Sequence, residues 1–137
     1  MSKTLVLDTH VWVKFVAGAP LKKQARAAIE RAASAGGRVR IPSISLWEIA
    51  RLEQDGRLKL GERPARWFDA ALATIAGELV DLSPAIALTA AALVCHGDPA
   101  DRLIMATAIE LDSVLLTRDN AILEYATQSE TLRVLEA

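Results

Sequence analysis

The strongest constraint on the fold is a regular alternation of short apolar runs with longer amphipathic segments. Residues 4–8 form an apolar run without polar alternation, which is typical of a strand buried on both faces. The predicted strands are 4–8, 38–41, 79–82, 113–117 and 131–135, and the predicted helices are 10–16, 21–35, 46–55, 64–76, 84–95, 99–111 and 121–125. Strands separated by helices predict an α/β fold, a three-layer α/β/α sandwich with a mainly parallel central sheet.

The composition indicates one globular domain, residues 1–137. Hydrophobic residues make up 52% of the chain and charged residues 24%, which argues against disorder. No apolar run reaches the roughly 18 residues of a membrane span, and the run that ends at Asp8 is too short for a signal peptide. The single cysteine excludes an internal disulfide. We therefore expect a cytoplasmic protein without a membrane partner.

Charge is distributed unevenly, although the net charge is only −1. Residues 1–66 contain 13 of the 16 Lys and Arg and 6 of the 17 acids, so the first half is basic and the second acidic. Such asymmetry is compatible with one basic surface that meets phosphate, or with solvated faces that folding mixes. The same two interpretations apply to a group of cations that precedes residue 67: Arg51, Arg57, Lys59, Arg63 and Arg66.

Several acids stand at the junctions that follow or precede the predicted strands. Asp8 ends the first strand, Asp119 lies just past the fourth, and Glu48 lies one turn into the helix after the second. Asp98 and Asp101 open the helix before the fourth strand. In an open parallel sheet, ligands bind beyond the carboxyl ends of the strands, so these acids are expected to converge at one edge. Gathered carboxylates repel one another, and either protonation or a divalent cation such as Mg²⁺ or Mn²⁺ relieves that repulsion. Such an ion can bind a phosphodiester and activate a water.

Most of these acids also have a purely structural interpretation. Ser45 and Glu48 fit a capping box, Asp98 and Asp101 fit the first turn of a helix that starts at a proline, and Asp119 fits a turn or cap. One alternative is therefore a non-catalytic protein-interaction domain whose acids are helix caps. That alternative predicts no stabilisation by Mg²⁺ or Mn²⁺.

Asp8 is the exception, because a carboxylate that ends a buried strand has no capping role unless a helix begins at once. A phosphatase with Asp8 as nucleophile is a further alternative. It requires an acid two residues later, where this chain has His10. The joint placement of the acids at one edge favours a metal site over any single-residue explanation.

Four blocks of the sequence resemble the PIN-domain family, and most closely its VapC-type toxins of bacterial and archaeal toxin–antitoxin pairs. The blocks occur in family order and span residues 5 to about 125; they are residues 5–12, 44–50, 96–108 and 116–119. The resemblance implies a Mg²⁺- or Mn²⁺-dependent endoribonuclease that cleaves RNA and usually forms a homodimer. It also implies a small antitoxin that docks across the active-site groove and itself binds operator DNA.

The resemblance assigns roles to individual residues. Asp8, Glu48, Asp101 and Asp119 match the four catalytic, metal-binding acids of the family. Two further residues match supporting positions, listed here with their implied roles: Asp98, a cap first and a supporting acid second, and Thr117, a small hydroxyl residue near the metal.

Five other side chains leave two interpretations open. Trp12, Trp47 and Trp67 are expected in the core or a dimer interface, with an apolar groove for an antitoxin helix as the alternative. Arg102 and Arg118 adjoin acids, and they either steer the scissile phosphate or pair with a neighbouring carboxylate.

Overall fold

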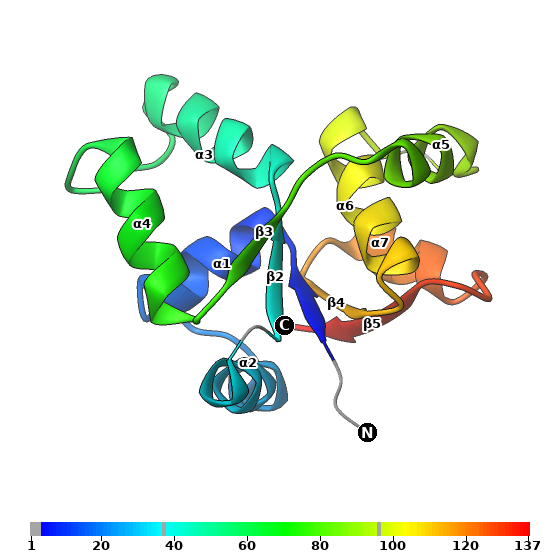
Figure 1. Cartoon of the computed structure of the whole chain (residues 1–137), viewed down its shortest axis with the longest axis horizontal. Coiled ribbons are helices and arrows are strands. Elements are labelled where there is room, and N and C mark those ends of the chain that lie inside the picture. The colour runs from blue at the N-terminus through cyan, green and yellow to red at the C-terminus, as the bar shows by residue number, and fades with distance from the viewer. Residues whose placement is uncertain (1–3, 37, 96) are drawn as a thin grey trace.

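A computed structural model describes residues 4–36, 38–95 and 97–137, which form five strands and seven helices (Figure 1). In chain order these are β1 (Leu5–Leu7), α1 (Thr9–Val16), α2 (Lys23–Ala35), β2 (Val39–Pro42), α3 (Ile44–Gln54), α4 (Pro64–Thr74), β3 (Glu78–Val80), α5 (Pro84–Ala92), α6 (Pro99–Glu110), β4 (Val114–Thr117), α7 (Asn120–Ala126) and β5 (Arg133–Glu136). Every predicted strand and helix is present, and no end differs from the prediction by more than three residues.

The five strands form one sheet in the order β3-β2-β1-β4-β5, and all neighbours are parallel. The central strand is β1, where Leu5 is in register with Val39 of β2 and Val114 of β4. The prediction of a mainly parallel sheet is confirmed. Because the strands are parallel, the chain leaves each strand at the same edge, and Asp8 and Asp119 are both delivered there.

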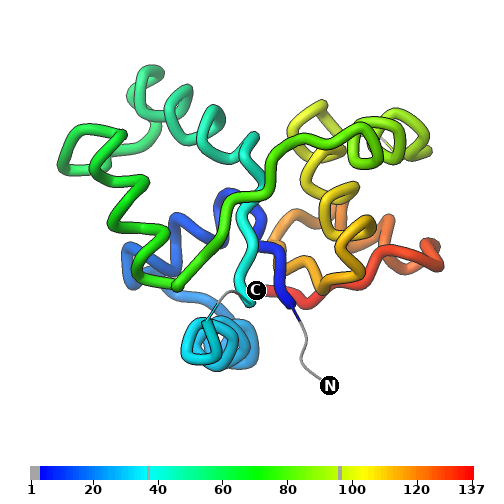
Figure 2. Tube along the Cα trace, viewed as in Figure 1, coloured from blue at the N-terminus to red at the C-terminus, as the bar shows by residue number. Residues whose placement is uncertain are grey.

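Both faces of the sheet are covered, which explains the apolar runs without polar alternation. Helices α1–α4 lie on one side of the sheet and α5–α7 on the other (Figure 2). Leu5 and Leu7 belong to a core that includes Trp12, whereas Val6 belongs to a second core that includes Ile104 of α6. Successive side chains of a strand point to opposite faces, so a strand between two cores needs apolar residues at every position.

Four helix ends differ from the prediction by two or three residues: the starts of α2 and α3, and the ends of α4 and α5. Helix α3 begins at Ile44, two residues early, and Ser45 lies buried inside it instead of capping it. Helix α5 ends at Ala92 instead of Cys95. Helix α2 ends as predicted at Ala35, followed by Gly36 with a positive φ of 73°; Gly37, the second glycine of that predicted stop, lies outside the described residues.

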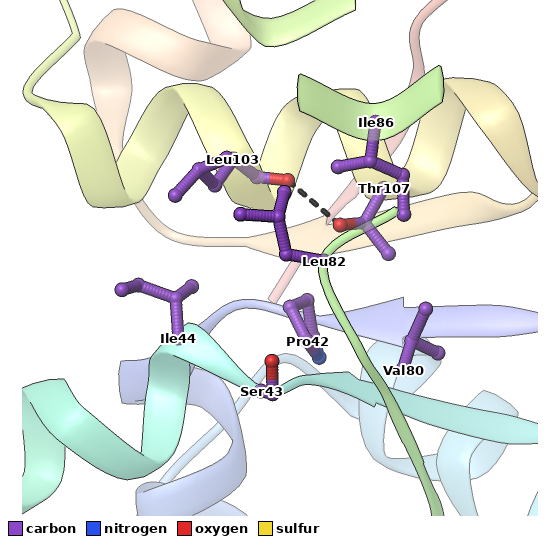
Figure 3. A pocket seen from close by; sticks show the side chains of 8 residues that line it. All are labelled: Pro42, Ser43, Ile44, Val80, Leu82, Ile86, Leu103 and Thr107. Carbon is purple, nitrogen blue, oxygen red and sulfur yellow. Dashed lines mark hydrogen bonds between the residues drawn. The ribbon is translucent and has the colours of Figure 1, made fainter. Parts of the chain in front are cut away.

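Beyond the ends of β2 and β3, apolar packing fills the space between the sheet and the helices (Figure 3). A cavity of only about 20 Å³ remains, lined by residues that include Pro42, Val80 and Leu103. It has room for about one water molecule. The Thr107 hydroxyl beside it donates to the Leu103 carbonyl at 2.7 Å. This cavity is therefore too small for a ligand larger than water.

The three tryptophans divide between the core and the surface. Trp12 and Trp67 are buried with ring centroids 5.4 Å apart, which confirms them as core residues. Trp47 on α3 is 56% exposed and contacts the Arg51 guanidinium, 5.7 Å from its ring centroid. Of the three, only Trp47 is available to a partner.

Within the described ranges, no helix combines the length and apolar character needed to cross a membrane.

Candidate metal centre and active site

Asp8 leaves the central strand as a buried carboxylate. It occupies the N-cap position of α1, yet its side chain makes no capping hydrogen bond, and only 5% of it is exposed. Its oxygen Oδ2 accepts a hydrogen bond from the Thr117 hydroxyl at 2.7 Å. Burial raises the pKa of Asp8, and the Thr117 hydrogen bond and the nearby His10 partly offset this increase. A helix does begin directly after Asp8, one residue earlier than predicted, but the Asp8 side chain does not cap it.

Thr117 connects the two acids that follow β1 and β4. Its hydroxyl donates to Asp8 and accepts a hydrogen bond from the Asp119 backbone N–H at 3.1 Å. The side chain is fully buried at the last position of β4. Thr117 thus lies beside the acids, as expected from its match to a supporting residue.

Glu48 is held by a hydroxyl pair that the sequence did not reveal. The Thr9 hydroxyl donates to Glu48 Oε1, and it lies 2.8 Å from the Ser45 hydroxyl. Since Thr9 has only one hydroxyl proton and uses it for the carboxylate, Ser45 must be the donor to Thr9. The proposed capping box of Ser45 and Glu48 is therefore wrong. Thr9 directly follows Asp8, and that adjacency was the only available signal for its role.

Asp98 and Asp101 occupy the first turn of α6 in the way the sequence predicted. Asp98 is the N-cap residue, and its Oδ1 accepts from the Asp101 backbone N–H at 2.8 Å. Pro99 follows at the first helical position. Asp101 is half-buried, and its own carboxylate caps nothing. The capping role of Asp98 is confirmed.

Asp119 caps α7 with one oxygen. Its Oδ1 accepts from the backbone N–H groups of Ala121 and Ile122, at 2.8 and 3.2 Å. The cap predicted from the sequence is confirmed. The hydrogen bonds of the described residues leave its second oxygen, Oδ2, without a partner. A cap of this kind is compatible with a second role, because a carboxylate has about four acceptor positions.

The acids from these four segments act on one another electrostatically. The pKa of Asp101 is raised to about 7, first by burial and then by the charges of Asp98, Asp8, Asp119 and Glu48. Burial also raises the pKa of Glu48, the Thr9 hydrogen bond lowers it, and the charges of Asp8 and Asp98 raise it further. The topology therefore brings the predicted acids into one negative neighbourhood.

The donors in this neighbourhood fit a hard divalent cation, because carboxylate and hydroxyl oxygens are the ligands that Mg²⁺ and Mn²⁺ prefer. Among the described residues, however, no three His, Cys, Asp or Glu side chains already form a shell around a common point. These two observations agree if few carboxylates bind the ion directly. Mg²⁺ commonly takes one or two carboxylates and keeps several waters.

The two arginines next to these acids are engaged elsewhere. Arg102 donates to the carbonyls of Ala91, Leu93 and Cys95, at 3.2, 2.8 and 3.1 Å, and so holds the chain that follows α5. Arg118 donates to the Pro20 carbonyl at 3.2 Å. The expectation that Arg102 or Arg118 pairs with a neighbouring carboxylate finds no support in these contacts.

Known proteins share this arrangement of sheet and helices. A family model described as PIN domain matches residues 5–128. Ribonuclease VapC22 from Mycobacterium tuberculosis is 35% identical over 122 residues, which cover 87% of this chain and 89% of that protein. The crystal structure of VapBC2 from Rickettsia felis, bound to a DNA fragment from its promoter, matches with a TM-score of 0.71 and 20% identity, over 98% of both chains. DNA-bound VapBC from Salmonella typhimurium matches with a TM-score of 0.67 and 20% identity, also over 98% of both. At 20% identity, these two structures show that the fold is shared, and nothing beyond the fold.

Proposed function

We propose that this chain, which belongs to the PIN-domain family, is a metal-dependent endoribonuclease that acts as the toxin of a toxin–antitoxin pair. The observation that supports it most is the electrostatic neighbourhood around Asp101, to which four separate segments contribute an acid. The 35% identity to a ribonuclease over 87% of the chain supports RNA as the substrate. In this proposal Asp8, Glu48, Asp101 and Asp119 are the catalytic acids.

Each acid has a role that follows from its surroundings. Asp8 and Glu48 are oriented by the Thr117 and Thr9 hydroxyls, so their carboxylates are the fixed part of the site. The Asp101 carboxylate caps no helix and is half-buried, so its oxygens are free for the metal or its bound water. When bound, Mg²⁺ or Mn²⁺ would neutralise the acids, stabilise charge on the phosphate and make water more acidic.

The RNA backbone requires cations outside the acidic neighbourhood. Five basic residues on α3, α4 and their connection are exposed, and in this proposal they contact the RNA phosphates. They are Arg51, Arg57, Lys59, Arg63 and Arg66. Contacts of this kind lose affinity steeply with salt. Substrate binding is therefore expected to weaken between low and physiological ionic strength.

The proposed partners are a small antitoxin protein and a second copy of the chain. The VapBC structures that match the fold are complexes, and two of them are bound to DNA. They support an antitoxin partner for this chain, and in this proposal the antitoxin, not the toxin, contacts the operator DNA. The exposed Trp47 on α3 is a candidate contact for either protein partner. A toxin with these partners would act on RNA in the cytoplasm.

The decisive test is cleavage of single-stranded RNA by the purified chain with Mg²⁺ or Mn²⁺, and with EDTA. We expect cleavage only with metal, and none with Asp8→Asn, whose circular dichroism spectrum should match that of the unaltered protein. Asp69→Asn, an exposed acid on α4, is the matched control and should remain active. Full activity of Asp8→Asn, or cleavage that EDTA does not reduce, would contradict the proposal.

A further inference from the structure

A large cavity opens beside the carboxylates, between α6 and α7. Its volume is about 530 Å³, and Asp101 and Asp119 form part of its wall together with Met105, Tyr125 and Gln128. Pockets that bind small ligands commonly enclose about 300–1,000 Å³. Asp8 and Glu48 are not among its lining residues. The cavity therefore borders the acidic neighbourhood on one side and extends away from it along α7.

One wall of this cavity is an aromatic ring with no aromatic partner. Tyr125 is half-buried and packs against the core that contains Met105 and Ile122. Within the described part of the chain, its ring stacks on no other ring and its hydroxyl makes no hydrogen bond. A half-buried aromatic ring that lines a cavity is the kind of group on which nucleobases stack.

The rim of the cavity is rich in hydrogen-bond acceptors. Apart from the catalytic acids Asp101 and Asp119, Glu124 lines it with a carboxylate that only accepts, and the Gln128 amide adds one acceptor and two donors. Adenine, cytosine and guanine each present an exocyclic amino group, whereas uracil has none. An acceptor-rich rim therefore favours the three bases that carry an amino group.

The position of Tyr125 relative to Asp119 suits a single nucleotide. Asp119 caps α7 and Tyr125 lies six residues later, which is about 9 Å along a helix axis. Side chains in helices lean back toward the N-terminus, so the ring is brought toward the carboxylates. A phosphate at the acids and its attached base at Tyr125 would then occupy adjoining spaces.

We propose that this cavity is the subsite for the base of a nucleotide adjoining the scissile phosphate, and that it selects a base with an exocyclic amino group over uracil. The inference rests on the proposed ribonuclease function. It makes Tyr125 the stacking platform and Gln128 a residue that determines specificity.

The first experiment is cleavage of a short RNA pool of randomised sequence, with the cut ends sequenced. Uracil should be depleted at one position beside the cut. Tyr125→Ala should lower kcat/KM by about 5- to 150-fold, the range for loss of one base stack, while Tyr125→Phe retains most activity. Gln128→Ala should flatten the base preference. Leu123→Ala, on the same helix but outside the cavity lining, is the matched control. Uniform base use with an unaffected Tyr125→Ala variant would overturn the subsite.

The second experiment does not depend on catalysis. RNA carrying 6-thioguanosine is photocrosslinked to the Asp8→Asn protein in Mg²⁺, and the attached peptide is identified by mass spectrometry. We expect attachment within residues 105–128, abolished by adding Tyr125→Ala and retained with Leu123→Ala. Attachment confined to other segments would overturn the subsite. An unaltered chain that cleaves no RNA with either metal would refute the nuclease proposal alone, since the crosslink still reports where the base binds.

Discussion

Replacement of Asp101 by Asn is expected to stabilise the metal-free protein at pH 8. Burial and four neighbouring carboxylates raise the pKa of Asp101 from 3.8 to about 7. The folded state therefore holds this proton more tightly than the unfolded chain does. Stability is highest below the unfolded pKa and is lost as pH rises through the window from about 4 to about 7. Asparagine keeps the shape of the side chain and removes the charge.

The magnitude follows from the same pKa. The difference between 3.8 and about 7 corresponds, at about 1.36 kcal/mol per pH unit, to roughly 4 kcal/mol at most. Asp101 is half-exposed, so solvent screening reduces the effect to about 1–2 kcal/mol. The variant also loses a favourable charge in the first turn of α6, which costs about 0.3–1 kcal/mol. We expect a net gain of about 1 kcal/mol at pH 8, falling to about zero at pH 4.

The assay is urea denaturation of both proteins at pH 4, 6 and 8 in EDTA, repeated at pH 8 with Mg²⁺. Metal at 100 times its Kd would add about 2.7 kcal/mol to the unaltered protein and less to the variant, so the order of stability should reverse. Asp69→Asn should change stability by no more than about 0.5 kcal/mol at any pH. A destabilised Asp101→Asn protein in EDTA at pH 8, or a difference that persists at pH 4, would refute this reasoning.

Three further substitutions test the contacts around the site. Thr117→Val should lower the free energy of unfolding, measured by urea denaturation, by about 1–3 kcal/mol, because the buried Asp8 carboxylate loses its hydroxyl donor. Thr117→Ser should restore most of that stability. Equal stabilities of all three proteins would contradict the bridging role of Thr117. Arg102→Lys should destabilise by about 1–3 kcal/mol, because an ammonium group cannot reach three separate carbonyls as the guanidinium does, and a neutral result would mean that this loop needs no support. Trp67→Ala, in the core, should lower the free energy of unfolding by about 3–5 kcal/mol, whereas Trp47→Ala, at an exposed position, should lower it by less than about 1 kcal/mol. Comparable losses for the two variants would place Trp47 in the core.

The elements of the fold were predictable because the three inner strands, β2, β1 and β4, lie between two apolar layers. The run Leu5, Val6 and Leu7 needs no alternation when both faces are buried, and the Gly and Pro residues mark the helix ends. The largest error is at the end of α5, which stops at Ala92 and not at Cys95. Arg102 binds the carbonyls of Leu93 and Cys95 in the segment that follows, and no local pattern announces that contact.

The convergence of the acids was predictable from topology, whereas their supports were not. Parallel strands deliver Asp8 and Asp119 to one edge, so their proximity follows from the order of elements. The hydroxyl pair that holds Glu48 depends instead on how α1 packs beside α3, across 36 residues of sequence. The same Ser45 looked like a helix cap, because a serine three residues before a glutamate is a local signal for one.

Caps and metal ligands are not exclusive roles for these acids. Asp98 and Asp119 do cap helices, as a purely structural interpretation requires, but each spends one oxygen on the cap. Capping does not explain Asp8, which lies at an N-cap position without using it, or Asp101, whose charge opposes four others. A fold that needed only caps would gain stability by neutralising Asp101. A cation that offsets the repulsion explains why a carboxylate stands at this position, and the reversal of stability order with Mg²⁺ measures that offset.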